Sequence, residues 1–175
     1  MTKELMLAAF ASLETKLQAP LHLIMGGGGA MLLAHQFPLS SSGVDAVPAL
    51  GLSLVELAPI IQAVAKELSL AGDWLNPHYA SFTHVLPSDY GHRLIEVVNL
   101  PKLKVSALSK EDLLIMKCFA GREKDVIHAR ALLKKGADRN FVSAHIRALG
   151  QKRIPGCERA EKFLDEMVRF FEEQE

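Results

Sequence analysis

The spacing of apolar residues in the first half of the chain predicts alternating helices and strands. Apolar side chains recur every three or four positions over residues 2–18, which is the period of one face of an α-helix. Short apolar runs at 21–25 and 44–49 are typical of buried strands. A Ser-x-x-Glu capping box then predicts a helix over 54–70 that ends near Gly72. This order of elements is typical of an α/β protein.

The middle of the chain predicts further strands. The aromatic, turn-rich stretch 73–81 indicates a loop that folds back toward the sheet. Three β-prone runs follow at 82–86, 93–99 and 103–108, separated by proline- and glycine-containing turns. Glu96 lies within the second run, so its carboxylate either faces a site or reaches solvent from an edge strand.

The last third of the chain predicts helices. Ser109 caps a helix that continues through the charged segment 112–131, and Gly136 ends the helical region with a left-handed cap. Two further helices are expected at 141–150 and 158–173. The apolar stripe of the last helix is expected to pack on the domain or on a second copy of the chain; it consists of Phe163, Met167, Phe170 and Phe171.

The predicted fold is α/β (α+β), with a small mixed β-sheet flanked by helices. We expect residues 1–136 to form this domain and residues 137–175 to form a C-terminal helical extension packed on it.

Four consecutive glycines, Gly26 to Gly29, stand where the first strand turns into a helix. Glycine tolerates backbone angles that other residues avoid, and it lets a phosphate approach the chain. The N–H groups at the start of a helix form a favourable site for an anion. Asp45 opens the next strand, where a Mg²⁺ ligand would lie beside such a corner. A plain packing role is the alternative for the glycines.

The chain resembles the nucleotidyltransferase superfamily, specifically its bacterial AbiEii-like and minimal-nucleotidyltransferase group. The pattern of that group is a strand, Gly-Gly, a helix, a polar loop and a strand that opens with Asp-x-Asp. Gly28 and Gly29 match the Gly-Gly, and Asp45 matches the second aspartate. Gly43 replaces the first aspartate, so one metal ligand is missing. The resemblance spans about residues 20–136 and implies a nucleotidyltransferase-like fold.

The resemblance also implies a reaction. A nucleoside triphosphate bound with Mg²⁺ would donate a nucleotidyl group to an acceptor hydroxyl on an RNA, a protein or a small molecule. Asp45 would bind the Mg²⁺, and Glu96 would supply the third acid of the family pattern. The phosphate-binding residues of the first motif would be Gly28, Gly29, Ser41 and Ser42.

The segment 112–131 carries the second part of the resemblance, in which a lysine precedes an Arg/Lys-Asp cluster. Lys117 and Lys124 are seven residues apart and would share one helical face, where they would neutralise the leaving pyrophosphate. Arg122 and Asp125 would complete the nucleotide-binding residues. The alternative is a solvated charged face with a weak Arg122–Asp125 pair.

The motifs allow three other interpretations. A dinucleotide-binding Gly-x-Gly-x-x-Gly fails because Met31 stands at the third glycine. The segment 131–140 is similar to the tail of an ankyrin repeat, but such repeats need several copies, and the chain shows one. The loss of the acid at Gly43 favours the third interpretation, a catalytically inactive binding protein of the same fold, such as one component of a toxin–antitoxin pair.

The composition of the chain limits the classes of binding partner that we expect. The 175 residues carry a formal net charge of zero, so no sequence-wide attraction to nucleic acid or membranes is expected. A basic patch is the local exception, a solvated surface or a contact to RNA or phosphate; it comprises Arg147, Lys152, Arg153 and Arg159. The two cysteines and the lack of a signal peptide or membrane span predict a reduced, cytoplasmic protein. The histidines, including His78, His84 and His92, lack zinc-site spacing.

Overall fold

The computed structural model describes residues 1–38 and 41–172, without the side chain of Phe171. The chain forms two compact units, and the boundaries between them differ from the division expected at residue 136. Unit 1 comprises Met1–Ala80 and Leu94–Leu108, and unit 2 comprises Ser81–Arg93 with the chain from Ser109 onward. Each unit is described separately below.

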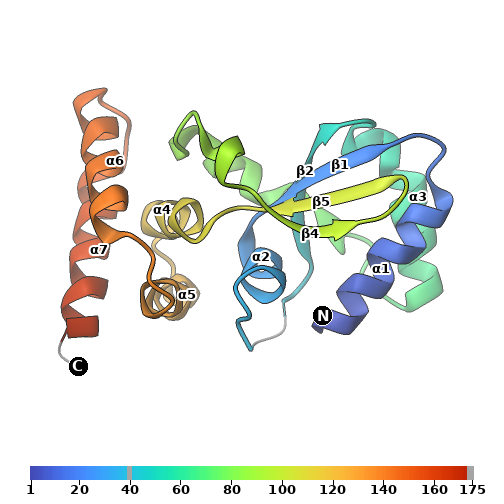
Figure 1. Cartoon of the computed structure of the whole chain (residues 1–175), viewed down its shortest axis with the longest axis horizontal. Helices are drawn as coiled ribbons and strands as arrows, with labels where there is room; N and C mark the ends of the chain where they lie inside the picture. Colours follow the sequence, from blue (N-terminus) through green and yellow to red (C-terminus); the bar gives the residue numbers. More distant parts are fainter. Residues whose placement is uncertain (39–40, 173–175) are drawn as a thin grey trace. The chain divides into compact units, whose positions relative to one another are not determined.

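Unit 1 contains a five-stranded mixed sheet and three helices (Figure 1). The strands lie in the order β3-β2-β1-β5-β4. The pairs β1–β5 and β2–β3 are parallel, whereas β1–β2 and β4–β5 are antiparallel. The elements are α1 (Lys3–Lys16), β1 (Leu21–Met25), α2 (Gly27–Leu33), β2 (Val44–Leu50), α3 (Leu54–Leu68), β3 (Leu75–Asn76), β4 (Ile95–Asn99) and β5 (Leu103–Ala107).

The two faces of this sheet differ in polarity. One face carries fully buried apolar side chains, which include Leu23, Met25 and Val105. Helix α1 packs on this face, since Met6 and Met25 both approach Gly29. Side chains alternate along a strand, so His22 and Asp45 project from the opposite, more polar face.

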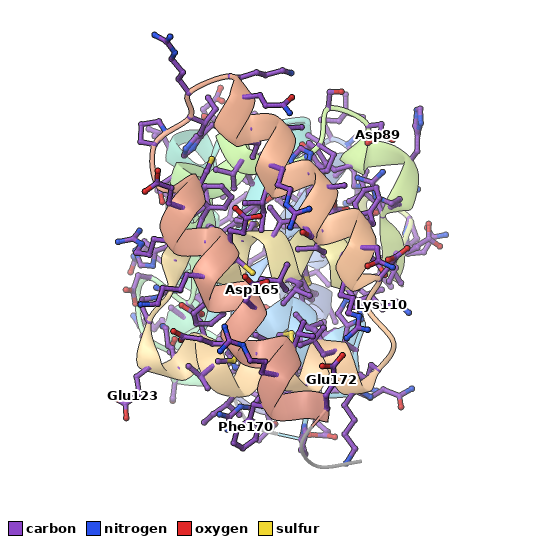
Figure 2. All side chains as sticks on the ribbon, turned by 90° about the vertical axis from the view of Figure 1, so that its left-hand side faces the viewer. Asp89, Lys110, Glu123, Asp165, Phe170 and Glu172 are labelled. Atoms are coloured by element: carbon purple, nitrogen blue, oxygen red, sulfur yellow. The ribbon has the colours of Figure 1, made fainter. Side chains whose placement is uncertain are left out.

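Unit 2 is helical. It contains η1 (His78–Val85, which begins in unit 1), η2 (Tyr90–Arg93), α4 (Lys110–Ala120), α5 (Glu123–Lys134), α6 (Arg139–Gln151) and α7 (Cys157–Glu172). Figure 2 shows α6 and α7 side by side, with Asp165 and Phe170 on α7. Helix α7 also packs on α4 and α5. The last helix therefore docks within its own unit, where Phe170 lies under the guanidinium of Arg130 at 3.4 Å from the ring centroid.

The predicted fold class is confirmed, because the structure is a mixed sheet flanked by helices. The capping box of Ser53 and Glu56 and the helix cap at Asp138 are also present. Among the residues described, no helix combines the length and apolarity needed to cross a bilayer.

Several local predictions are wrong. The run 82–86 is 3₁₀ helix rather than strand, and the expected loop at 73–81 contains strand β3. Helix α3 ends at Ser69, which adopts the left-handed conformation with φ +53°, before Gly72. The long helix expected from Ser109 is broken in two, because Gly121 takes a left-handed cap with φ +57° and ends α4.

Candidate functional site

The turn from β1 into α2 is held by strand pairing and by a tyrosine. The N–H of Gly26 donates to the carbonyl oxygen of Asp45 (2.9 Å), which continues the β1–β2 pairing up to the corner. The ring of Tyr79 packs directly against Gly26, where an added Cβ would lie 3.0 Å from its Cγ. Its hydroxyl donates to the carbonyl oxygen of Ile24 (2.8 Å). A side chain at Gly26 would displace this ring.

The carboxylate of Asp45 points into the glycine corner. Gly27 adopts φ +59°, a conformation that favours glycine, and a Cβ at this position would overlap Oδ2 of Asp45 and lie 2.9 Å from its Cγ. Gly27 therefore has to be glycine for two reasons, its backbone conformation and the approach of the carboxylate. Sequence reasoning chose Gly28 and Gly29 and missed Gly27.

The two glycines chosen from sequence lie in the first turn of α2. A Cβ on Gly28 would lie 2.9 Å from Oγ of Ser41, so the loop before β2 closes over this turn. Ser41 itself donates to the carbonyl oxygen of Gly43 (2.7 Å), and Ser42 is exposed beside it. A Cβ on Gly29 would instead meet Met25 and Met6 in the core, which indicates a packing role. Ser40 of the same loop lies outside the described residues.

Gly43 has no room for an aspartate side chain. A Cβ there would lie 2.8 Å from the backbone carbonyl oxygen of Trp74. That oxygen accepts from the N–H of Val44 (2.6 Å), so it is held by the pairing of β2 with β3. An aspartate at this position would push the two strands apart.

Asn76 and His78 are the polar neighbours of Asp45 that sequence reasoning missed. The parallel pairing of β2 and β3 places Asn76 directly opposite Asp45. The Asn76 side chain accepts a hydrogen bond from the N–H of His78 (3.1 Å), an Asx turn that reverses the chain. Nδ1 of His78 thereby lies 3.8 Å from Oδ1 of Asp45. Their side chains are 73% and 26% exposed, so a ligand reaches both.

Glu96 is not part of this cluster, contrary to expectation. Its strand, β4, is separated from β2 by β1 and β5, which puts about 14 Å between the two strands at the usual spacing. The Glu96 carboxylate pairs with Lys104 (3.2 Å) and accepts from Asn99 (3.0 Å). It is a partly exposed residue of an edge strand, which was the alternative weighed from the sequence.

A histidine, His22, projects from the polar face of the sheet on strand β1, between the strands that carry Asp45 and Glu96. Nε2 of His22 is 2.9 Å from Oγ of Ser106, in the central strands β1 and β5. Burial, and after it the charge of Lys104, lowers the pKa of His22 below its ordinary value. The positive charge near His22 is the ammonium group of Lys104, which pairs with Glu96.

In unit 2, Lys117 belongs to a buried ion cluster rather than to an open cationic face. Its Nζ donates to Oδ1 of Asp125 (2.8 Å), and the two side chains are 6% and 0% exposed. Asp125 also accepts from Nε of Arg122 (2.7 Å), so the predicted Arg122–Asp125 pair is present but buried at one end. Lys124 lies on α5 beyond the Gly121 break and is exposed. Lys117 and Lys124 therefore do not share a helical face.

Burial shifts the protonation of this cluster. Burial lowers the pKa of Lys117, and the hydrogen bond from Lys117 to Asp125 offsets only part of that effect. Burial acts in the opposite sense on Asp125, but its bonds from Arg122 and Lys117 outweigh it and lower its pKa. Burial and then the charge of Lys117 lower the pKa of His128 to about 4. The Lys117 ammonium is thus bonded to Asp125 and buried, so it is not available to a ligand.

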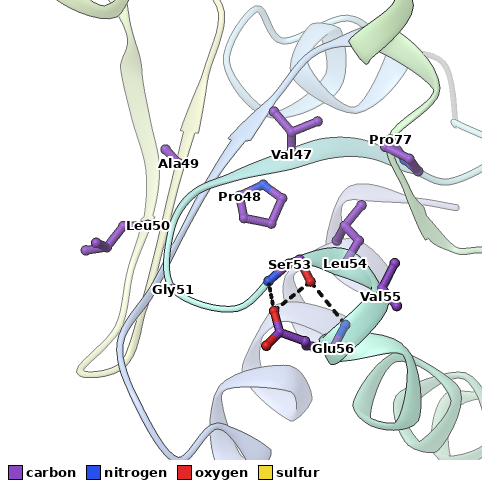
Figure 3. Close-up of a pocket in the computed structure, with 10 residues that line it drawn as sticks. All are labelled: Val47, Pro48, Ala49, Leu50, Gly51, Ser53, Leu54, Val55, Glu56 and Pro77. Carbon is purple, nitrogen blue, oxygen red and sulfur yellow. Dashed lines mark hydrogen bonds between the residues drawn. The ribbon is translucent and has the colours of Figure 1, made fainter.

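The described residues also line pockets outside this corner. One, of 630 Å³, is formed by the end of β2, the start of α3 and Pro77, with mostly apolar walls (Figure 3). Its one carboxylate, Glu56, is occupied by the cap at Ser53 (Figure 3). Another, of 840 Å³, lies between α6 and α7 in unit 2 and holds three residues of the basic patch.

Two of the four residues of the basic patch bind acceptors within the protein. Arg147 pairs with Glu161 (2.6 Å), and Arg159 donates to the carbonyl oxygen of Phe119 (3.0 Å). Lys152 and Arg153 are exposed. These contacts support the solvated-surface interpretation of the patch more than a phosphate site.

Comparison with known protein families shows the family of this chain. Residues 4–149 match a family described as "Nucleotidyltransferase of unknown function (DUF6036)". The chain belongs to this family. The match confirms the nucleotidyltransferase superfamily that the sequence resemblance indicated. Searches of curated proteins and of solved structures found no match.

In this member of the DUF6036 family, the glycine corner carries a small set of polar groups. Within the described ranges 1–38 and 41–172, no group of three or more His, Cys, Asp and Glu residues is placed to hold a metal ion. The corner offers one carboxylate, one imidazole and one carboxamide, from Asp45, His78 and Asn76. Any cation there needs its remaining ligands from water or from a bound substrate.

Proposed function

We propose that this chain binds a nucleoside triphosphate at the glycine corner and transfers its nucleotidyl group to an acceptor hydroxyl. One observation carries the proposal: the Asp45 carboxylate lies against Gly27, where the strand turns into α2. Membership of a nucleotidyltransferase family supports the same reaction type. The acceptor oxygen would attack the α-phosphorus, its proton would leave to solvent or a base, and pyrophosphate would depart.

The corner fits a divalent cation bound together with a triphosphate. Mg²⁺ is usually held by one or two carboxylates plus substrate phosphates and water, so a single carboxylate is compatible with it. Asp45 would be that ligand, and its closeness to Gly27 leaves no space for a side chain between carboxylate and backbone. The cation would supply charge neutralisation on the phosphates. The N–H groups at the start of α2 would face the same anion.

A second candidate function is nucleotide binding without transfer, and the position of Gly43 favours it. The backbone of Trp74 occupies the space that the first aspartate would need. Without that ligand, a second cation that activates the acceptor has no bridging carboxylate. In this case the bound nucleotide would control an interaction with a partner protein, as in a toxin–antitoxin pair.

The test combines binding with turnover. Wild-type protein at a triphosphate concentration of about 100 times Kd should gain about 2.7 kcal/mol of stability, measured as a rise in Tm. Asp45→Asn should lose this gain, whereas Asp165→Asn, the same change at an exposed position on α7, should keep it. If no triphosphate raises the Tm, the proposal is wrong.

Turnover separates the two candidate functions. Transfer would release pyrophosphate from a labelled triphosphate in the presence of RNA or protein acceptors. Pyrophosphate release that Asp45→Asn abolishes supports the enzyme. A Tm rise without release, across all triphosphates and acceptors, supports the binding protein.

A further inference from the structure

We infer that His78 and Asp45 form a two-ligand site for a cation that accepts imidazole, of the Mn²⁺, Co²⁺ or Zn²⁺ class, in preference to Mg²⁺. The inference rests on the proposed function, because the same cation would meet the triphosphate at the glycine corner. It goes beyond that function by assigning the metal class and a histidine ligand.

Geometry brings the two groups within reach of one ion. Nδ1 of His78 and Oδ1 of Asp45 are 3.8 Å apart. Two ligands at about 2.0 to 2.2 Å from Zn²⁺ in a tetrahedral shell lie roughly 3.3 Å apart, so a small rotation of the exposed imidazole suffices. Because the imidazole is 73% exposed, nothing buried has to move.

The turn that carries His78 is held on both sides. Before it, the Asn76 side chain accepts from the His78 N–H (3.1 Å) and donates to the carbonyl oxygen of Asp73 (3.2 Å). After it, Tyr79 is buried and its hydroxyl is bonded to Ile24 (2.8 Å). The backbone of His78 is therefore fixed relative to β1 and β2. A preorganised backbone lowers the cost of placing a ligand.

The chemistry of the donors selects the metal. Mg²⁺ prefers carboxylate, phosphate and water oxygens, whereas the first-row transition ions from Mn²⁺ to Zn²⁺ also accept imidazole, and the affinity of a given nitrogen and oxygen site rises from Mn²⁺ toward Cu²⁺. At this corner the carboxylate that the family pattern would have at Gly43 is absent, and an imidazole stands beside the remaining one. Replacing an acid by a histidine shifts preference away from Mg²⁺.

Local sequence patterns do not indicate that His78 and Asp45 form a pair. Asp45 and His78 are 33 positions apart (78 − 45), and neither lies in a His-x-x-x-His or Cys-x-x-Cys pattern. The parallel pairing of Asp45 with Asn76 and the Asx turn that follows bring them together. The site therefore depends on strand β3, which periodicity did not predict.

The test measures metal binding directly. Tag-free protein, stripped with a chelator, is titrated with Mn²⁺ while the electron paramagnetic resonance signal of free Mn²⁺ is followed, and then with Mg²⁺ as competitor. Wild type should bind Mn²⁺ at least tenfold more tightly than Mg²⁺. His78→Gln should weaken Mn²⁺ binding about tenfold or more and leave Mg²⁺ binding unchanged. Bound Co²⁺ should show ligand-field bands that change in this variant.

Controls keep the outcome interpretable. His92→Gln, an equal change at an exposed histidine of η2, should bind Mn²⁺ as wild type does. Asp45→Asn should weaken the binding of both ions. An unchanged Tm would show that His78→Gln is folded. Mn²⁺ affinity of His78→Gln within threefold of wild type would overturn the inference.

The inference and the proposed function can fail separately. If a triphosphate raises the Tm but Mn²⁺ and Mg²⁺ bind equally and His78→Gln changes neither, the metal assignment is wrong and nucleotide binding stands. If His78→Gln weakens Mn²⁺ binding but no triphosphate raises the Tm, the metal site stands and the proposed function is wrong.

Discussion

The contact between Gly27 and Asp45 predicts that adding one methyl group, in Gly27→Ala, lowers the free energy of unfolding substantially. Gly27→Ala places a Cβ where Oδ2 of Asp45 lies and forces an L-residue to keep φ +59°. The left-handed conformation alone costs about 1–2 kcal/mol. Moving the carboxylate out of its position adds a comparable amount, so we expect a total loss of about 2–4 kcal/mol in the free energy of unfolding.

Urea unfolding measures this loss, and a double-mutant cycle separates its two parts. In an Asp45→Ala background the carboxylate is gone, so Gly27→Ala should cost only the backbone strain of about 1–2 kcal/mol. Gly91→Ala is the matched control, because a Cβ there meets nothing within 4 Å and its φ is not in the left-handed region. It should change stability by less than about 0.5 kcal/mol.

The result that refutes this reasoning is an equal cost in both backgrounds. It would mean that Gly27 is required only for its backbone angle and that the carboxylate does not occupy the corner. The Asp45 position that carries the proposed function would then be wrong as well.

Two further predictions concern the ion cluster of unit 2. Lys117→Met leaves the fully buried Asp125 with one cationic partner and should lower the free energy of unfolding in urea by about 3 kcal/mol. The control Lys124→Met, at an exposed position, should lower it by less than about 0.5 kcal/mol. Similar losses in the two variants would contradict the buried pair. The pKa of His128 is about 4 in the folded chain and 6.5, the ordinary value, in the unfolded chain, so between these pH values the unfolded chain binds more protons. The contribution of His128 to the free energy of unfolding is therefore complete above pH 6.5 and should fall by about 1–2 kcal/mol on acidification toward pH 4, after allowance for solvent screening. His128→Gln should flatten this part of the pH dependence.

The fold class and most helices followed from local signals. The helical period of α1 and the capping box at Ser53 are properties of a few neighbouring residues, so the sequence alone predicted them. The errors fall where local signals compete. The helix-forming residues around Gly121 predict a continuous helix. Glycine adopts the left-handed conformation of a helix cap at low cost, however, and Gly121 ends α4 in this conformation.

The candidate site shows the same division. The glycine run and Asp45 were visible in the sequence because they are close together in the chain. Asn76 and His78 were not, because strand β3 has two residues and joins the sheet only through its pairing with Val44 and Asp45. Glu96 was misassigned because alternation along a strand gives the face of the sheet but not the number of strands between two residues.

The sequence by itself determined that this chain forms an α/β nucleotidyltransferase-type fold with a glycine corner and a single aspartate beside it. Tertiary structure decided which groups surround that aspartate and which charges are buried. Strand order placed His78 next to Asp45 and Glu96 far from it, and helix packing buried Lys117 against Asp125. The reason is physical: periodicity and capping act between near neighbours, whereas the partner of a charge depends on which distant segments the core brings into contact.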